Sequence, residues 1–123
     1  MYALLVKGHV GLAVLALLLT IGWGALVVAA SAGPGRSSRL VYIGAMASTG
    51  LVGVTGVITA FAGGFATMAF PWIGLVAVAG HGFAGVRSRR NLAADRKPAA
   101  IGAAALQAAL LLVAYGVMTA KPF

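Results

Sequence analysis

The chain has 123 residues, of which 62% are hydrophobic and only 8% are charged. Soluble domains are about a quarter charged, so this composition excludes an ordinary soluble fold and favours a chain solvated largely by lipid. The net charge is +8 with cations at the ends of apolar runs, Asp95 is the only acid and cysteine is absent; this disfavours nucleic-acid binding and excludes disulfides, thiol chemistry and catalysis by paired carboxylates.

Four apolar runs are expected to form four membrane-spanning helices. The first is followed by the breaker-rich link "SAGPGRSSR". No charged residue occurs between Leu40 and Val86, a stretch that would extend about 70 Å as one helix and must therefore fold back. "FAGGFATMAFPW" supplies the turn, with paired glycines and then Pro71 in the first turn of the next helix. The sequence predicts a single all-α domain over residues 1–123, a four-helix bundle with spans at about 3–29, 40–61, 70–89 and 98–119.

The cations predict how this bundle is oriented. Arg36 and Arg39 lie in the first link, and five more lie in the third: Arg87, Arg89, Arg90, Arg96 and Lys97. The positive-inside rule places both links in the cytoplasm and both termini on the periplasmic side of a bacterial inner membrane. We expect the cations of the third link to contact anionic lipid headgroups or an acidic partner protein. The first run is longer than the apolar region of a usual secretory signal and is followed by arginines, so we expect it to remain as a span.

Small residues recur at helical spacing and predict close helix packing. Ala45, Thr49 and Gly53 repeat every fourth residue in the second run, and a similar face of the third run contains Gly74, Ala77 and Gly85. Lipid tails are as apolar as leucine, so helices in a bilayer associate through such close contacts and a few polar bonds. These faces pack within the bundle or dock a partner subunit or a second copy, and the sequence leaves both interpretations open.

Two histidines, His9 and His81, lie inside the first and third runs, where an ionisable side chain is a functional hypothesis by default. In the predicted topology their depths agree within about one helical turn. One interpretation makes them axial ligands of haem b or of a chlorophyll-type pigment. The other makes each ring a hydrogen-bond partner of a backbone carbonyl or of a threonine on a neighbouring helix, with four threonines as candidates: Thr20, Thr49, Thr55 and Thr59. A proton relay is a third interpretation, disfavoured because no acidic residue lies in any span.

Two segments resemble the small bacterial SirB-type membrane proteins. "MYALLVKGHVGLAVLALLLTIGWG" is similar to their first helix, in which a lysine shortly precedes a histidine. "PWIGLVAVAGHGFAGVRSRR" is similar to their third helix, which is entered through proline and tryptophan and left through arginines. The start of the second helix departs from the family pattern, because "RSSRLVYIG" lacks the histidine and aspartate often found there. The resemblance covers about a third of the chain; it implies four helices and no biochemical activity.

Close-packing surface is abundant and chemistry is scarce, which predicts a non-enzymatic role. We expect an accessory or assembly subunit without a cofactor, which packs against other membrane helices in a respiratory or photosynthetic complex. The alternative is an electron-transfer protein that binds haem b or a pigment through His81 and His9. A small transporter or channel is a third class, although few polar residues line any predicted face.

Overall fold

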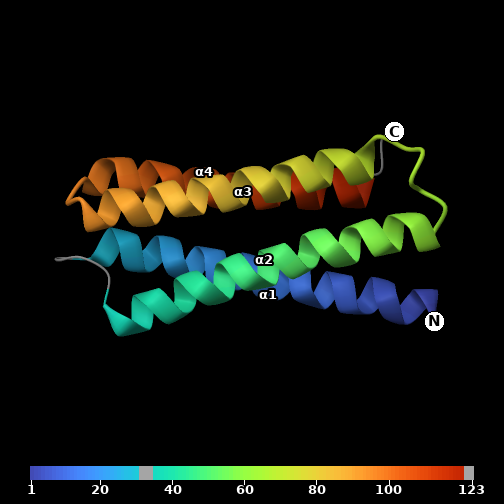
Figure 1. The fold of residues 1–123 in the computed structure, drawn as a ribbon, viewed down its shortest axis with the longest axis horizontal. Coiled ribbons are helices and arrows are strands. Elements are labelled where there is room, and N and C mark those ends of the chain that lie inside the picture. Colours follow the sequence, from blue (N-terminus) through green and yellow to red (C-terminus); the bar gives the residue numbers. More distant parts are fainter. Residues whose placement is uncertain (31–34, 121–123) are drawn as a thin grey trace.

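A computed structural model describes residues 1–30 and 35–120 as four α-helices. They are α1 (Tyr2–Ala29), α2 (Arg36–Ala62), α3 (Phe70–Ala93) and α4 (Lys97–Ala120), which lie side by side along one long axis (Figure 1). Each contains 24 to 28 residues, which corresponds to about 36–42 Å at the rise of an α-helix. The all-α, four-helix architecture predicted from the apolar runs is confirmed for the described residues.

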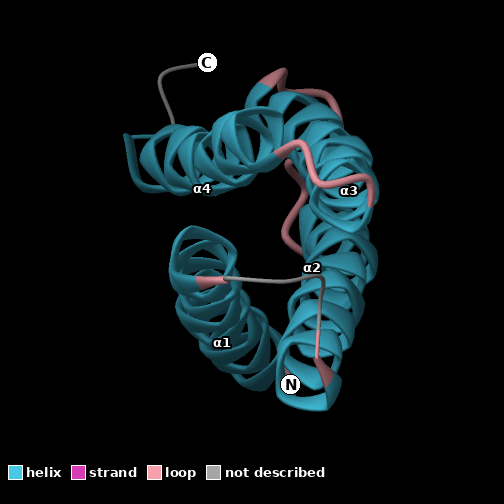
Figure 2. Cartoon of the chain, turned by 90° about the vertical axis from the view of Figure 1, so that its left-hand side faces the viewer, coloured by secondary structure: helices cyan, strands magenta, loops and turns pink. Residues whose placement is uncertain are grey.

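The bundle consists of two helical hairpins. α1 packs mainly on α2 and α3 packs mainly on α4, while the contacts of α1 with α4 and of α2 with α3 are less extensive. Figure 2 shows the four helices following one another round the bundle in chain order. We call the end at which α1 and α3 finish the basic end, and the end at which α2 and α4 finish the pocket end (Figure 1).

Three of the four helices, α1, α2 and α4, are long and apolar enough to cross a membrane. α3 is as long as α4 but is not among them. It contains Pro71, Trp72 and His81 and ends in arginines, and these residues lower its average hydropathy. The prediction of four spans is therefore supported for three helices by length and composition.

Two helices extend beyond their predicted apolar spans. α2 begins at Arg36, about four residues early, and α3 continues to Ala93, about four residues late. Arginine is a good helix former, so the backbone ladder continues past the end of the apolar run. Residues 31–34 of the first link lie outside the described residues.

The two connections that are described both end a helix with a residue of positive φ. Gly64 (φ 75°) follows α2, where Phe65 N–H donates to the Ala60 carbonyl. Asp95 (φ 58°) follows α3, where the next backbone N–H donates to the Asn91 carbonyl. Such a left-handed residue completes the Schellman arrangement that satisfies the last helical carbonyls. Pro71 lies in the first turn of α3, as predicted.

Apolar packing is densest at the basic end. One cluster of buried side chains joins all four helices there: Trp23, Val27, Tyr42, Leu92, Ala100 and Ala104. The rings of Trp23 and Tyr42 meet edge to face with their centroids 5.1 Å apart, an arrangement that aromatic quadrupoles favour. This cluster fills the interior of the bundle near the basic end.

Candidate functional site

Side chains from all four helices meet near the middle of the bundle. Oγ1 of Thr20, in α1, lies 2.9 Å from Nε2 of His81, in α3. The amide nitrogen of Gln107 of α4 lies 3.3 Å from the same imidazole nitrogen and 3.8 Å from Sδ of Met46 of α2. We call these four residues the central layer. The contact of Thr20 with His81 joins α1 to α3, and the contact of Gln107 with Met46 joins α4 to α2. Each of these pairs lies diagonally across the bundle, so the central layer holds the two hairpins together.

The backbone of α3 makes room for this layer. A Cβ atom on Gly85 would lie 2.5 Å from the Gln107 amide nitrogen and 2.7 Å from Sδ of Met46. Real Cβ atoms do not approach other heavy atoms so closely, so glycine is the residue that lets the Gln107 side chain reach the imidazole. His81 and Gln107 are both fully buried as a result.

The central layer has unused hydrogen-bonding capacity. An amide N–H only donates, so in this geometry Nε2 of His81 accepts from both the Gln107 amide and the Thr20 hydroxyl, and the neutral ring carries its proton on Nδ1. Three polar atoms in this region are buried without a hydrogen-bond partner among the described residues: Nδ1 of His81, Oε1 of Gln107 and Oγ1 of Thr49. The adjoining turns of α2 and α3 are in contact, with Gly53 facing Val78, so Thr49 belongs to nearly the same level. The layer can therefore bind a small polar group, but it contains no acidic side chain.

The second histidine, His9, contacts α2 nearer the pocket end. Its Nδ1 lies 2.9 Å from Oγ1 of Thr55, and the Thr55 hydroxyl donates to the Leu51 carbonyl at 2.8 Å. Oγ1 of Thr55 therefore faces the Leu51 carbonyl and the His9 ring at once, and in the tautomer with the proton on Nδ1 of His9, Nε2 is left as an acceptor. A Cβ on Gly56 would lie 3.2 Å from Cε1 of this ring, so glycine lets the imidazole lie close to α2.

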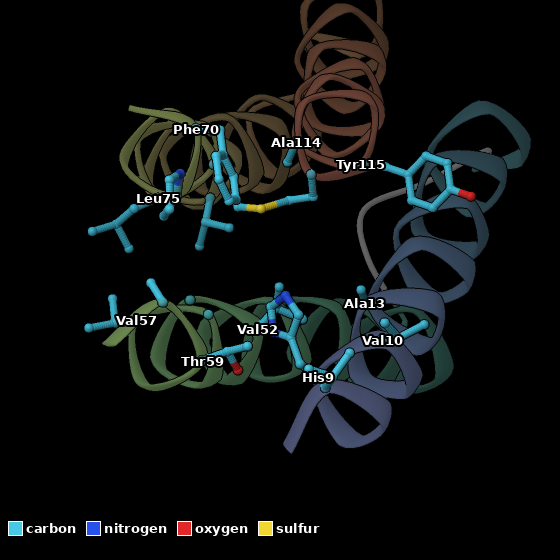
Figure 3. A pocket seen from close by; sticks show the side chains of 18 of the residues that line it. His9, Val10, Ala13, Val52, Val57, Thr59, Phe70, Leu75, Ala114 and Tyr115 are labelled. Carbon is cyan, nitrogen blue, oxygen red and sulfur yellow. The ribbon is translucent and has the colours of Figure 1, made fainter. Parts of the chain in front are cut away.

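A cavity of about 300 Å³ separates the two hairpins at the pocket end. All four helices line it, mostly with apolar side chains, and Figure 3 shows His9 and Tyr115 among them. Its inner limit lies one helical turn from the central layer, at Ala16, Val78 and Leu111. Such a volume is at the lower end of small-molecule sites.

The structure separates the two histidines that the sequence suggested as a ligand pair. His9 lines the pocket, whereas His81 is not part of its wall. Each ring contacts a threonine on another helix, Thr55 or Thr20, which agrees with the structural interpretation of both histidines. The other two candidates, Thr49 and Thr59, do not contact either ring through a hydrogen bond in the described residues. Haem or pigment ligation stays a prediction, and the two rings do not border one shared cavity.

All six residues predicted to pack helices are buried: Ala45, Thr49, Gly53, Gly74, Ala77 and Gly85. Gly53 faces Val78 of α3, and Gly74 faces the methyl end of Met118 of α4. In this structure the faces of small residues therefore pack against neighbouring helices of the same chain.

The cations predicted to contact lipid or a partner lie at the basic end. The guanidinium of Arg89 lies 5.1 Å from the centre of the Tyr42 ring, and that of Arg87 lies 5.8 Å from the Phe83 ring. Nζ of Lys97 donates to the carbonyl of Ala30, 2.8 Å away, where the negative end of the α1 dipole attracts a cation. Arg90 and Arg96 are exposed. Two of the five cations, Arg89 and Lys97, thus also connect different helices, whereas Arg87 contacts a ring of its own helix.

Sequence reasoning missed Gln107 and the aromatic side chains that line the pocket. Gln107 is the only glutamine of the chain and stands in the middle of an apolar run, which was the available signal. The sequence did not show that these aromatic side chains share one pocket, because helix packing brings together segments that are far apart in the chain. The side chains are Tyr2, Phe65, Phe70 and Tyr115.

No protein-family model, curated protein or solved structure matches the chain. The resemblance to SirB-type proteins therefore stays a prediction, and the function has to be argued from the geometry of this molecule.

Proposed function

We propose that the chain is a multi-pass protein of a bacterial inner membrane that serves as a non-catalytic accessory or assembly subunit. A single acidic residue and the lack of cysteine support the absence of catalysis. Its assembly would be with other membrane helices, for which a respiratory or photosynthetic complex is the expected setting.

The outer surface supports insertion into a bilayer. Large apolar side chains are exposed along the middle of every helix, among them Leu18 (62%), Leu51 (51%), Val76 (71%) and Leu112 (56%). Soluble monomers rarely expose contiguous apolar areas beyond a few hundred Å². The buried polar side chains of the central layer lie inside the bundle, which is the arrangement that a hydrocarbon solvent requires.

α3 crosses with the other three in this proposal. Two of its polar side chains face the interior: His81 bonds within the central layer, and the Ser88 hydroxyl donates to the Ala100 carbonyl at 2.9 Å. Its exposed positions between the ends include Ile73, Val76 and Phe83. Hydropathy averaged over the helix counts the interior face as well, so it understates how apolar the outward face of α3 is.

Cysteine labelling tests the proposed topology. The chain has no cysteine, so single substitutions report without a background. We expect Thr67→Cys, in the exposed connection at the pocket end, to react with a membrane-impermeant maleimide in intact spheroplasts. Ala94→Cys, in the exposed turn at the basic end, is expected to react only after permeabilisation, because arginine-rich connections stay in the cytoplasm. Labelling of Ala94→Cys in intact spheroplasts would contradict the orientation.

The observation that carries the subunit role is an unpaired face of small residues on α4. We call it the α4 face; it consists of Gly102, Ala105, Ala109 and Gly116, all exposed, with the exposed Val113 between the last two. No atom lies within 4 Å of a Cβ built on Gly102 or Gly116. A foreign helix can approach the backbone closely along such a face, which is how helices associate in lipid.

Widening the α4 face is expected to abolish association with a partner helix. Ala109→Phe places a large ring in the face and should convert the complex seen by native electrophoresis of detergent extracts into the free chain. Ala47→Phe is the matched control, since Ala47 is exposed on α2, away from α4, and should leave the complex intact. A wild-type chain that migrates alone and gives no crosslinked product in native membranes would refute the subunit role.

A further inference from the structure

We propose that the pocket between the hairpins binds a membrane-soluble aromatic molecule whose hydroxyl group donates a hydrogen bond to Nε2 of His9. The site is independent of the α4 face, and binding there goes beyond a role as a packing subunit. The ligand class is a phenol or quinol with a flat ring.

The shape and position of the pocket suit a ligand that arrives from the bilayer. The pocket holds about 300 Å³ between the two hairpins, enough for one or two rings. Its rim includes Val10 and Val14 of α1 and Tyr115 of α4, each more than half exposed. The opening between α1 and α4 therefore faces the surroundings of the bundle, which would be lipid.

Aromatic side chains favour a ring over an acyl chain. The whole chain contains ten aromatic residues, five Phe, three Tyr and two Trp, and four of them line this one pocket: Tyr2, Phe65, Phe70 and Tyr115. The Phe65 and Phe70 rings already lie 5.6 Å apart in a tilted pair. Offset and edge-to-face contacts with such rings stabilise a further flat ring beyond its buried area.

His9 decides which polar group the ligand carries. Its Nδ1 lies 2.9 Å from Oγ1 of Thr55, and in the tautomer that donates from Nδ1 to Thr55 the imidazole Nε2 offers a lone pair. Nε2 has no hydrogen-bond partner among the described residues, and Figure 3 shows the ring at the pocket wall. An acceptor inside an apolar wall selects a donor such as a phenolic O–H and rejects an ether or a hydrocarbon of the same shape.

Binding of 2-naphthol to the purified chain in lipid nanodiscs, followed by its fluorescence, tests the proposal. We expect saturable binding that is about three- to tenfold tighter than that of 2-methoxynaphthalene, the range of one hydrogen bond. His9→Phe keeps an aromatic ring but removes the acceptor, so the preference for 2-naphthol over 2-methoxynaphthalene should vanish while 2-methoxynaphthalene binds as before. If the preference is lost while 2-methoxynaphthalene still binds, the variant has lost a hydrogen bond and its pocket is still folded.

Filling the pocket provides the second arm. Ala13→Leu lies in the pocket wall and should weaken both naphthalenes at least about tenfold, because a small cavity does not accept extra methyl groups without strain. Ala47→Leu, exposed on α2 outside the pocket, is the matched control and should bind like the wild type. The proposal is overturned if neither naphthalene saturates, if 1-decanol displaces 2-naphthol at equal concentration, or if His9→Phe retains the preference for the phenol. Displacement by decanol would identify the occupant as a lipid chain.

Discussion

His81→Ala is expected to lower the free energy of unfolding by about 3 kcal/mol. The imidazole is fully buried and joins Thr20 to Gln107. Its removal leaves two interior polar groups without their partner, at about 1–3 kcal/mol each, and opens a cavity that the neighbouring helices fill only in part. The unfolded chain in a micelle finds some of these partners again, which keeps the expected total below the sum.

Titration of SDS into mixed micelles measures this loss through the fluorescence of Trp23, which is fully buried against Tyr42. A Trp72→Phe background removes the second indole. His9→Ala is the matched control: that ring is only partly buried and has one hydrogen bond, to Thr55, so we expect a loss of about 1 kcal/mol. Equal losses for the two histidines would show that the central layer does not hold the hairpins together.

The absorption spectrum of the same His81→Ala protein addresses the haem alternative. A Soret band in the wild type from haem-replete cells that disappears in this variant would establish His81 as an axial ligand. A colourless wild-type preparation would retire that interpretation and leave His81 with its contacts to Thr20 and Gln107.

Gly85→Ala is expected to destabilise the bundle by about 2–3 kcal/mol although it adds a single methyl group. The new Cβ would lie 2.5 Å from the amide nitrogen of Gln107. The amide can move away only by losing its contact with His81, so strain and a lost hydrogen bond add together. The same SDS titration measures the effect.

Gly102→Ala is the matched control for this substitution. Gly102 is exposed and lies within α4, away from its ends, and no side chain or neighbouring helix comes within 4 Å of a Cβ built on it. Alanine at this position should raise the free energy of unfolding by up to about 1 kcal/mol, since glycine is the weaker helix former. The double variant Gly85→Ala/Gln107→Ala should lose less than the sum of its two single changes, because the truncated side chain no longer meets the new methyl group. Stabilisation by Gly85→Ala, as at Gly102, would contradict the close packing at this layer.

The sequence by itself determined the four helices and the positions of the connections between them. The long apolar runs could only be helical in a chain with so little charge. The paired glycines before Pro71 predicted the connection between α2 and α3, and the arginines predicted the basic end. These features are local, because hydropathy, helix propensity and turn preference depend on residues that are neighbours in the chain. Local patterns also explain why α2 begins at Arg36 and α3 continues to Ala93, because helical propensity extends beyond the apolar run.

Only the tertiary structure decided which polar side chains meet and where space is left between the hairpins. The sequence offered four threonines for two histidines, but the pairing of Thr20 with His81 spans 61 positions and depends on how α1 and α3 are rotated toward each other. The same rotation brings Gln107 to Met46 and gathers Tyr2 and Phe70 round the pocket. Helix rotation is set by the sum of many small packing contacts, to which no single residue contributes enough to be recognised in the sequence.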